Sequence, residues 1–305
     1  MCEAICQQQE QTYNTYDTNY QKVGEFHLVF GHPMKSEPQL TIFDDNYKLV
    51  EFRLSQIEEE LNELKEAVEK EDFVECIDAV CDLMYFVYGT YHVFGVNFDD
   101  LTPKPKVRLF ESPVNNTKVF ENDISPFQMQ ISMLSQVLSL LTLSCEEHDF
   151  DSAITYLAKL EALCHTAGSL LGVNIDECFT EVHRSNMTKV CVSEEEAQET
   201  VQNYKTDTRY AEPDYRKSET TRYWVVYDKA TSKILKSVKF ELPKLADVIG
   251  LKIEVPEVVE SCVNQCDPVA EQYHKVPTFA MTEVEVVVET EPEVQENDLP
   301  VIELN

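Results

Sequence analysis

Residues 54–94 read LSQIEEELNELKEAVEKEDFVECIDAVCDLMYFVYGTYHVF, and this pattern predicts two helices that meet at a short polar turn. An α-helix advances about 100° per residue, so the apolar residues of the first part fall on one face. That face consists of Leu54, Ile57, Leu61, Leu64 and Val68. We therefore expect helices over residues 54–70 and 73–94, packed as an antiparallel hairpin around the turn Glu71-Asp72.

The two predicted helices carry carboxylates at related spacings. On the second helix, the acids follow the i, i+3, i+7 spacing of a single helix face. The set consists of Glu59, Glu60 and Glu63 on the first helix and Glu75, Asp78 and Asp82 on the second. Matching the two helices about their turn brings Glu63 level with Asp78 and Glu60 level with Asp82.

These acids have an ordinary interpretation and a functional one. Asp and Glu make up 56 of the 305 residues, so solvated acidic helix faces are expected throughout the chain. Aspartate is nevertheless a poor residue for a helix interior, and Asp78 and Asp82 have apolar neighbours and few nearby Lys or Arg. Carboxylates in such surroundings need a counter-charge. A divalent cation held against a polyphosphate would supply that charge, so the six acids predict a metal site.

Several motifs resemble those of a known group of enzymes. The EExxE pattern ending at Glu63 is followed by the run Asp82-Leu83-Met84-Tyr85 on the next helix. Other motifs are EFHLVFGHP at residues 25–33, Tyr88-Gly89-Thr90, and EVHRSNMTK at residues 181–189. Together they resemble the all-α nucleotide pyrophosphohydrolases, which include MazG-type enzymes, dimeric dUTPases and phosphoribosyl-ATP pyrophosphohydrolase. EVHRSNMTK is similar to a signature of phage, bacterial and large-DNA-virus members.

The resemblance implies a hydrolase that cleaves a nucleoside triphosphate or deoxynucleoside triphosphate to the monophosphate and pyrophosphate, including dUTP as a candidate. It also implies Mg²⁺, for which Mn²⁺ can substitute, held by Glu60, Glu63 and Asp82, with Glu59 as the general base. The family has a further Glu three residues before Asp82, where this chain has Ala79. Asp78 or Glu75 is left to supply the fourth ligand.

The resemblance also assigns residues to substrate binding. In EVHRSNMTK, cationic and amide side chains complement phosphate oxygens or ribose. The residues implied are His183, Arg184, Asn186 and Lys189, together with Tyr85 on the second acidic helix. On composition alone, the same basic residues would suit the C-terminal end of a surface helix.

The acidic hairpin is followed by a second copy of itself. LSQIEEEL at residues 54–61 recurs as LSQVLSLL at residues 134–141, and FGVNFDD at residues 94–100 recurs as LGVNIDE at residues 171–177. In the second copy the six acids are replaced by Ser139, Leu140, Leu143, Ser152, Thr155 and Lys159. The sequence therefore predicts a mainly α, tandem-duplicated core, a covalent pseudo-dimer in which only the first copy has metal ligands. Two such pseudo-dimers could associate further as a homodimer.

The remaining segments define the expected domain organisation. Residues 1–22 are predicted to be disordered, 23–100 to form the first repeat, 101–126 a linker and 127–190 the second repeat. Residues 193–204 predict a helix with Ser193 as its N-cap, and the alternating stretch 221–240 predicts a β-hairpin broken at 229–232. The lysines on this hairpin have two interpretations, contact with phosphates or an acidic neighbour, and protection of an edge strand against aggregation, of which the second is the more ordinary. Residues 251–305 form an acidic tail that we expect to be disordered.

Composition limits the partners and the location. A formal net charge of −31 argues against nucleic acid as a partner, because phosphate backbones are bound through Lys and Arg. The start of the chain lacks the basic and apolar parts of a signal peptide, and the sequence contains no run of 18 apolar residues, so we expect a cytoplasmic protein, in the host cytoplasm if viral. Two other functions stay open: a catalytically inactive helical scaffold, and a protein that sequesters nucleotides without turnover.

Overall fold

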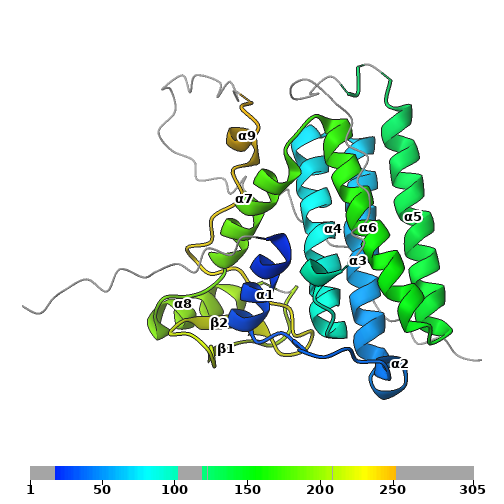
Figure 1. Cartoon of the computed structure of the whole chain (residues 1–305). Helices are drawn as coiled ribbons and strands as arrows, with labels where there is room; N and C mark the ends of the chain where they lie inside the picture. Colours follow the sequence, from blue (N-terminus) through cyan, green and yellow to red (C-terminus); the bar gives the residue numbers. More distant parts are fainter. Residues whose placement is uncertain (1–17, 102–118, 122, 208, 252–305) are drawn as a thin grey trace, which may run out of the picture. The chain divides into compact units, whose positions relative to one another are not determined.

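The computed structural model describes residues 18–101, 119–121, 123–207 and 209–251 (Figure 1). The greater part of the predicted disordered N-terminus, most of the predicted linker and nearly all of the acidic tail lie outside these residues. The described part is mainly helical and has one small β-hairpin, which confirms the predicted fold class. Among the described residues, no helix combines the length and the hydropathy that crossing a bilayer requires.

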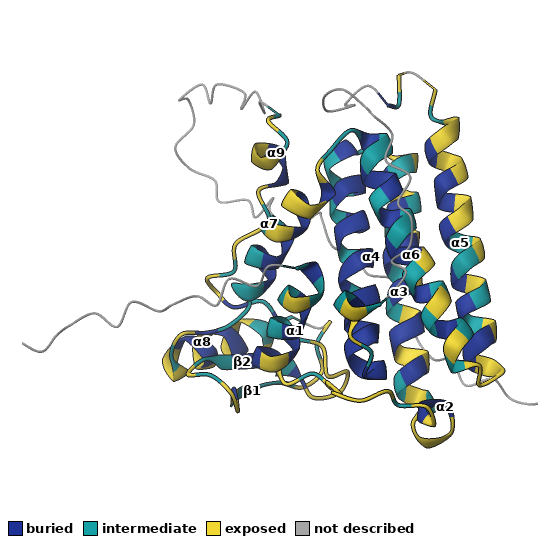
Figure 2. Cartoon of the chain, viewed as in Figure 1, coloured by how far each residue is buried: buried dark blue, intermediate teal, exposed yellow. Residues whose placement is uncertain are grey.

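Four long helices form the central bundle (Figure 1). They are α3 (Tyr47–Glu69), α4 (Phe73–Phe94), α5 (Ser125–Glu146) and α6 (Phe150–Leu171). Helices α3 and α4 pack against each other, as do α5 and α6, and the two pairs join through α4 with α6 and α3 with α5. The faces that meet inside the bundle are apolar and buried, as Figure 2 shows. The bundle is thus two helical hairpins that share one core.

The two hairpins have the same turn. At the end of α3, Glu71 adopts a left-handed conformation with φ of 55°, and at the end of α5, His148 does so with φ of 57°. The next residue caps the following helix in both cases: the Asp72 carboxylate accepts a hydrogen bond from the Glu75 amide, and the Asp149 carboxylate accepts one from the Ser152 amide. The second helices of the two hairpins are both 22 residues long. The hairpins therefore repeat each other in backbone conformation.

Two shorter helices cover α4. They are α1 (Asn19–Phe30) and α7 (Ile175–Met187), and both pack on α4 and on each other. Thr18 caps α1 by accepting a hydrogen bond from the Gln21 amide, and the Asn19 side chain donates one to Asp176 over 2.6 Å. The prediction of disorder up to residue 22 was therefore wrong in its last five residues, because a cap and tertiary contacts order them.

Helix α3 begins earlier than the sequence predicted. It starts at Tyr47 rather than Leu54, and Val50 in the added segment is fully buried. Val50 extends the apolar stripe by one helical turn, so the first turns of α3 have a core to pack on. The described residues also contain three short helical segments: α2 (Ile42–Asp45), the 3₁₀ helix η1 (Phe98–Asp100) and α9 (Leu245–Val248).

The β-hairpin is present, but the sequence misplaced its first strand. Strand β2 (Trp224–Asp228) falls inside the predicted stretch and pairs antiparallel with β1 (Pro213–Lys217), which precedes that stretch. The predicted return strand after residue 232 makes only an isolated bridge, between Tyr227 and Ile234. Strand β1 was missed because PDYRK lacks alternating apolar residues; it is instead fixed by tertiary contacts, with Arg216 donating to the Phe30 carbonyl.

The helix α8 (Glu194–Tyr204) forms where the sequence predicted it. Ser193 is its N-cap and accepts a hydrogen bond from the Glu196 amide. The helix packs on both strands around a small apolar cluster of its own, and a further cluster joins Val225 of β2 to Val29 and Phe30 of α1. The hairpin is thereby fastened to the end of α1, next to the acidic face of the bundle.

Gly95, at the end of α4, gives a test of how closely the segment around Glu37 packs on that helix end. It ends α4 with φ of 71°, and a Cβ at this position would overlap the carbonyl oxygen of Glu37. Gly250 has a similar φ of 69° but no atom within 4 Å of the position of a Cβ. We expect Gly95→Ala to lower the free energy of unfolding more than Gly250→Ala, for which the backbone conformation alone costs about 1–2 kcal/mol. Urea denaturation of both variants measures the difference, and equal losses would contradict the close contact.

Candidate functional site

The six predicted acids gather on the facing sides of α3 and α4. Glu60 is buried, and its pKa is raised to about 10 by burial first and then by Asp82, Glu63 and other carboxylates of the set. Burial, Asp82 and Glu59 also raise the pKa of Glu63, to about 7. Asp82 is thus the carboxylate with the strongest effect on both glutamates. Glu60 and Asp82 therefore lie near each other, as the alignment of the two helices predicted, whereas Glu63 interacts more with Asp82 than with Asp78, its predicted opposite.

The other acids of the second helix extend the same group. The pKa of Asp78 is raised well above its usual value by burial, Asp82, Glu75 and Glu63. Glu75 lies in the first turn of α4 and its pKa is raised by burial and by Asp72 and Asp82. We call Glu59, Glu60, Glu63, Glu75, Asp78 and Asp82 the acidic cluster.

Two oxygen atoms of the acidic cluster lack hydrogen bonds. Glu60 Oε2 and Asp78 Oδ1 are buried and have no hydrogen-bond partner among the described residues. A buried carboxylate oxygen without a partner is strongly unfavourable in a protein that has no compensating charge there. Hard oxygen ligands of this kind are those that Mg²⁺ prefers. The carboxylate oxygens of the acidic cluster are therefore suitable ligands for a divalent cation.

The carboxylates are near one another without forming a finished coordination shell. Within the described part of the chain, no three His, Cys, Asp or Glu side chains are arranged as a ligand set. Like-charged carboxylates repel, so side-chain conformations that bring their oxygens together are favoured only with a cation between them. Convergence of Glu60, Glu63 and Asp82 on one ion stays a prediction.

Two positions of the site depart from the simple pattern. Ala79, at the position where the resemblance predicted a further Glu, is 3% exposed and belongs to the apolar core, which leaves Asp78 and Glu75 as neighbouring acids. Glu59, the predicted general base, is half-buried and accepts a hydrogen bond from Gln56 over 2.9 Å. Glu59 is therefore oriented along α3 and lies close enough to raise the pKa of Glu60 and Glu63.

Lysines from two distant segments face the acidic cluster. Lys189, just after α7, is half-buried; burial lowers its pKa, while Asp82 and Glu60 act to raise it. Lys236 behaves in the same way opposite Asp78 and Asp82, and Lys233 lowers the pKa of Glu63. The interpretation as edge-strand lysines was therefore wrong for Lys233 and Lys236, because residues 233–236 lie beside the bundle instead of along a free edge.

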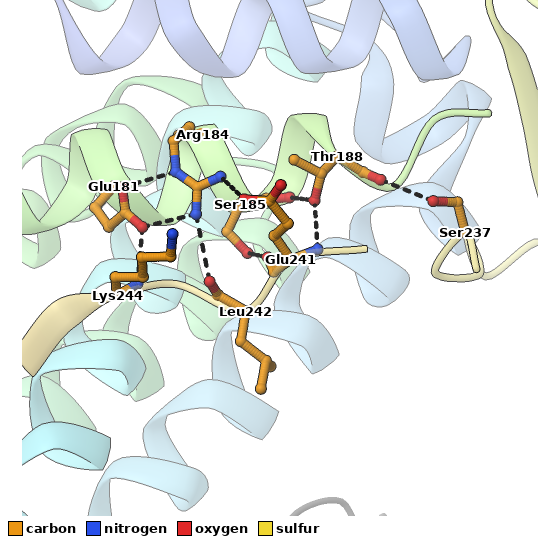
Figure 3. Close-up of polar contacts among 8 residues, drawn as sticks. All are labelled: Glu181, Arg184, Ser185, Thr188, Ser237, Glu241, Leu242 and Lys244. Atoms are coloured by element: carbon orange, nitrogen blue, oxygen red, sulfur yellow. Dashed lines mark hydrogen bonds and ion pairs between the residues drawn. The ribbon is translucent and has the colours of Figure 1, made fainter. Parts of the chain in front are cut away.

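A polar network holds residues 237–244, which follow Lys236, against α7 and Thr188 after it, as Figure 3 shows. The Ser185 hydroxyl donates to the Glu241 carbonyl over 2.7 Å, and the Ser237 hydroxyl donates to the Thr188 carbonyl over 3.1 Å. The Glu241 amide donates to the Thr188 hydroxyl. Since Lys189 and Lys236 each lie one residue from a member of this network, the network sets where their charges stand.

Arg184 belongs to this network and not to the acidic cluster. Its guanidinium forms ion pairs with Glu181 and Glu241, each over 2.8 Å, and donates to the Leu242 carbonyl (Figure 3). Its predicted contact with substrate is untested. The observed contacts instead fasten residues 241–244 to α7, because Glu181 also accepts a hydrogen bond from the Lys244 amide.

His183 connects the acidic face to α1. Its Nδ1 is 3.0 Å from the Tyr85 hydroxyl and its Nε2 is 3.0 Å from a Glu25 carboxylate oxygen. Both ring nitrogens are therefore occupied, and His183 is buried. Asn186 also hydrogen-bonds Tyr85. The four side chains thus fix one another one helical turn from Asp82. Glu25 belongs to the motif EFHLVFGHP but was not among the predicted site residues.

The comparisons with known proteins give a family for the part of the chain that carries the acidic cluster. Residues 23–104 match the phosphoribosyl-ATP pyrophosphohydrolase family, a range that includes the whole acidic cluster and ends before α5. An uncharacterized protein of Acanthamoeba polyphaga mimivirus is 36% identical over 240 residues, which cover 76% of this chain and 96% of that protein. No solved structure matches the chain.

The buried Glu60 carboxyl gives a test of the cluster's energetics. In EDTA at pH 8, we expect Glu60→Gln to raise the free energy of unfolding, because the amide removes a carboxyl that burial and its acidic neighbours disfavour. The amide cannot ionise and its NH₂ group can donate to the neighbouring carboxylates, so we expect a gain of about 1–3 kcal/mol, the scale of one satisfied buried polar group. Glu58→Gln, at an exposed position on the same helix, is the control. A loss of stability in Glu60→Gln relative to Glu58→Gln would contradict the prediction.

Glu63 predicts a pH dependence. Its pKa is raised in the folded protein from 4.5 to about 7, so it binds its proton more tightly folded than unfolded. Its stabilising contribution is complete below the unfolded pKa and is lost as the pH rises through the folded pKa. In EDTA, the free energy of unfolding should fall between about pH 4.5 and 7, and Glu63→Gln should reduce that fall. Urea denaturation across this range measures the free energy of unfolding of the unmodified protein and of Glu63→Gln. If Glu63→Gln shows the same pH profile as the control Glu58→Gln, the fall in stability does not come from Glu63.

Proposed function

Because this chain belongs to the MazG-like nucleotide pyrophosphohydrolase superfamily, we propose that it hydrolyses a nucleoside triphosphate to the monophosphate and pyrophosphate in a reaction that requires Mg²⁺. The observation that carries the proposal is the pair of buried oxygens, Glu60 Oε2 and Asp78 Oδ1, that have no partner within the described residues. They lie in a group of carboxylates that raise one another's pKa. An inactive scaffold has no use for such a group, which opposes folding.

Glu60, Glu63 and Asp82 would hold the ion, with Asp78 or Glu75 completing the set. Bound Mg²⁺ would polarise phosphate oxygens and neutralise the charge that develops on them. Mn²⁺ prefers similar oxygen ligands and is expected to substitute. Glu59, half-buried and hydrogen-bonded to Gln56, is the side chain proposed to accept a proton from the attacking water.

The lysines opposite the acidic cluster would meet the phosphates directly. Lys189 and Lys236 are half-buried, and burial lowers the pKa of both. A phosphate between the acids and these lysines would be held by the ion on one side and by charge-assisted hydrogen bonds on the other. His183 already has partners at both nitrogens, so we assign it to positioning Tyr85 and Asn186 instead of to direct substrate contact.

The base and sugar of the substrate are part of the proposal to be tested. Removal of dUTP or of damaged nucleotides is consistent with the reaction, and phosphoribosyl-ATP is included because the matching family is named for it. A panel of these triphosphates, assayed with Mg²⁺ for both pyrophosphate and monophosphate, distinguishes among them. Thermal stabilisation by a nucleotide without release of pyrophosphate would instead indicate sequestration.

Asp82→Asn tests the metal site directly. Asp82 acts on both Glu60 and Glu63, so its loss should lower Mg²⁺-dependent pyrophosphate release by at least about 100-fold, equivalent to about 2.7 kcal/mol in the activation free energy. Circular dichroism should show unchanged helicity, since the substitution keeps the size of the side chain. Glu58→Gln should retain activity. If Asp82→Asn is as active as the unmodified protein, the proposed site is wrong.

A further inference from the structure

We propose that Arg53, Arg216 and His32 form a second binding site, which takes a phosphate group directly and without a divalent cation. We call these three residues the basic cluster. They come from α3, β1 and the segment after α1, respectively. Taking the bound group to be a second phosphate of the substrate rests on the proposed function, whereas binding of phosphate itself does not.

Arg53 is a buried cation without an acidic partner. It is 6% exposed, and its two hydrogen bonds go to neutral oxygens, the Phe86 carbonyl at 2.8 Å and the Thr90 hydroxyl at 3.3 Å. No ion pair joins it to a carboxylate within the residues described. Gly89 makes room for it, because a Cβ there would overlap the guanidinium. A buried guanidinium of this kind is unfavourable unless an anion accompanies it.

Arg216, at the rim of the basic cluster, also has no carboxylate partner among the described residues. Its Nη2 donates to the Phe30 carbonyl over 2.7 Å, while its Nε is buried and has no partner among the described residues. The guanidinium rests against Gly31, where a Cβ would stand 3.1 Å from both terminal nitrogens. Arg216 is half-buried, so it reaches the surface as well. One donor of its planar fork is thus left for a ligand.

The shortage of acids at this place is local. The chain has 56 Asp and Glu against 25 Lys and Arg. Arg184 pairs with Glu181 and Glu241, and Arg209 pairs with Asp207 at 2.6 Å. Arg222 also lacks a carboxylate partner within the described residues, but it is exposed to water. In a protein with such an excess of acids, a buried and a half-buried guanidinium without a carboxylate indicate a place kept for an anion that the described residues do not supply.

His32 joins the two arginines and connects them to the acidic cluster. His32 follows Gly31, on which the Arg216 guanidinium rests, and its ring lies 5.3 Å from that of His27, which flanks Gly89 together with the Arg53 guanidinium. Burial, Arg53, Arg216 and Lys189 lower the pKa of His32 to about 4. Its ring stacks on Phe26 with centroids 5.5 Å apart, and Lys189 Nζ lies 5.9 Å from the centroid of the same Phe26 ring. A neutral His32 retains an N–H group that can donate to an oxyanion.

Lys189 therefore stands between two sites of opposite charge. On one side Asp82 and Glu60 interact with it, and on the other lie Phe26 and His32. The acidic cluster can take phosphate only through a cation, whereas the basic cluster can take it directly. The substrate class that suits both is a nucleotide with two phosphate groups apart from each other, or a triphosphate whose chain extends past Lys189.

The test measures binding of inorganic phosphate in EDTA by titration calorimetry, where the acidic cluster has no cation and repels the ligand. We expect Arg216→Gln and Arg53→Gln each to weaken binding by about tenfold or more, the effect of losing one charge-assisted hydrogen bond. Arg222→Gln, an equal charge change at an exposed position, should bind as the unmodified protein does. Thermal melts check folding; if Arg53→Gln does not fold, the partly exposed Arg216 carries the test.

Two results would overturn the proposal: no binding of phosphate by the unmodified protein in EDTA, or equal binding by Arg216→Gln and Arg222→Gln. Equal binding by all variants would mean that the arginines serve only as structural donors to the Phe30 and Phe86 carbonyls. Mg²⁺-dependent pyrophosphate release is assayed separately. Phosphate binding without any hydrolysis would therefore support the basic cluster and overturn only the proposed function.

Discussion

The constraint on which the rest of the structure depends is the enclosure of carboxylates between α3 and α4. Holding Glu60, Asp78 and Asp82 partly or fully out of water, close to one another, opposes folding. Apolar burial in the surrounding core offsets this unfavourable free energy. The residues that α3 and α4 bury include Ile57, Leu64, Ile77 and Val80, all fully buried. The acids are thus kept in place by apolar packing that they do not contribute to.

The second hairpin supplies part of that packing. Helices α5 and α6 have the same turn geometry and capping as α3 and α4, and they bury apolar faces against them. At the positions of the acids they carry residues such as Ser139, Leu140 and Thr155, so no second group of carboxylates opposes folding there. The bundle therefore combines one hairpin that encloses a group of carboxylates with a second hairpin of the same turn geometry that lacks such a group among the described residues.

Cations approach the site from outside the bundle. Lys189, Lys233 and Lys236 come from segments that follow α7 and β2, and the polar network around Thr188 and Glu241 fixes those segments. The attachment of β1 and β2 to the end of α1 brings Arg216 to the same region. The acids therefore lie on the long helices of the bundle, whereas the cations that face them lie on segments attached to it.

The sequence by itself determined the helical hairpin, its turn, its repeat and the face that carries Glu60, Glu63 and Asp82, because helix periodicity and capping act over a few neighbouring residues. It did not predict α1 before residue 23, the first turns of α3 or strand β1, whose local patterns are weak and whose order comes from contacts such as Asn19 with Asp176. Only the tertiary structure decided that Glu25 meets His183, that Lys236 faces Asp82 and that Arg53 and Arg216 lie around His32. These pairs are separated by tens to hundreds of residues, and charge acts through space, so no local pattern in the chain records them.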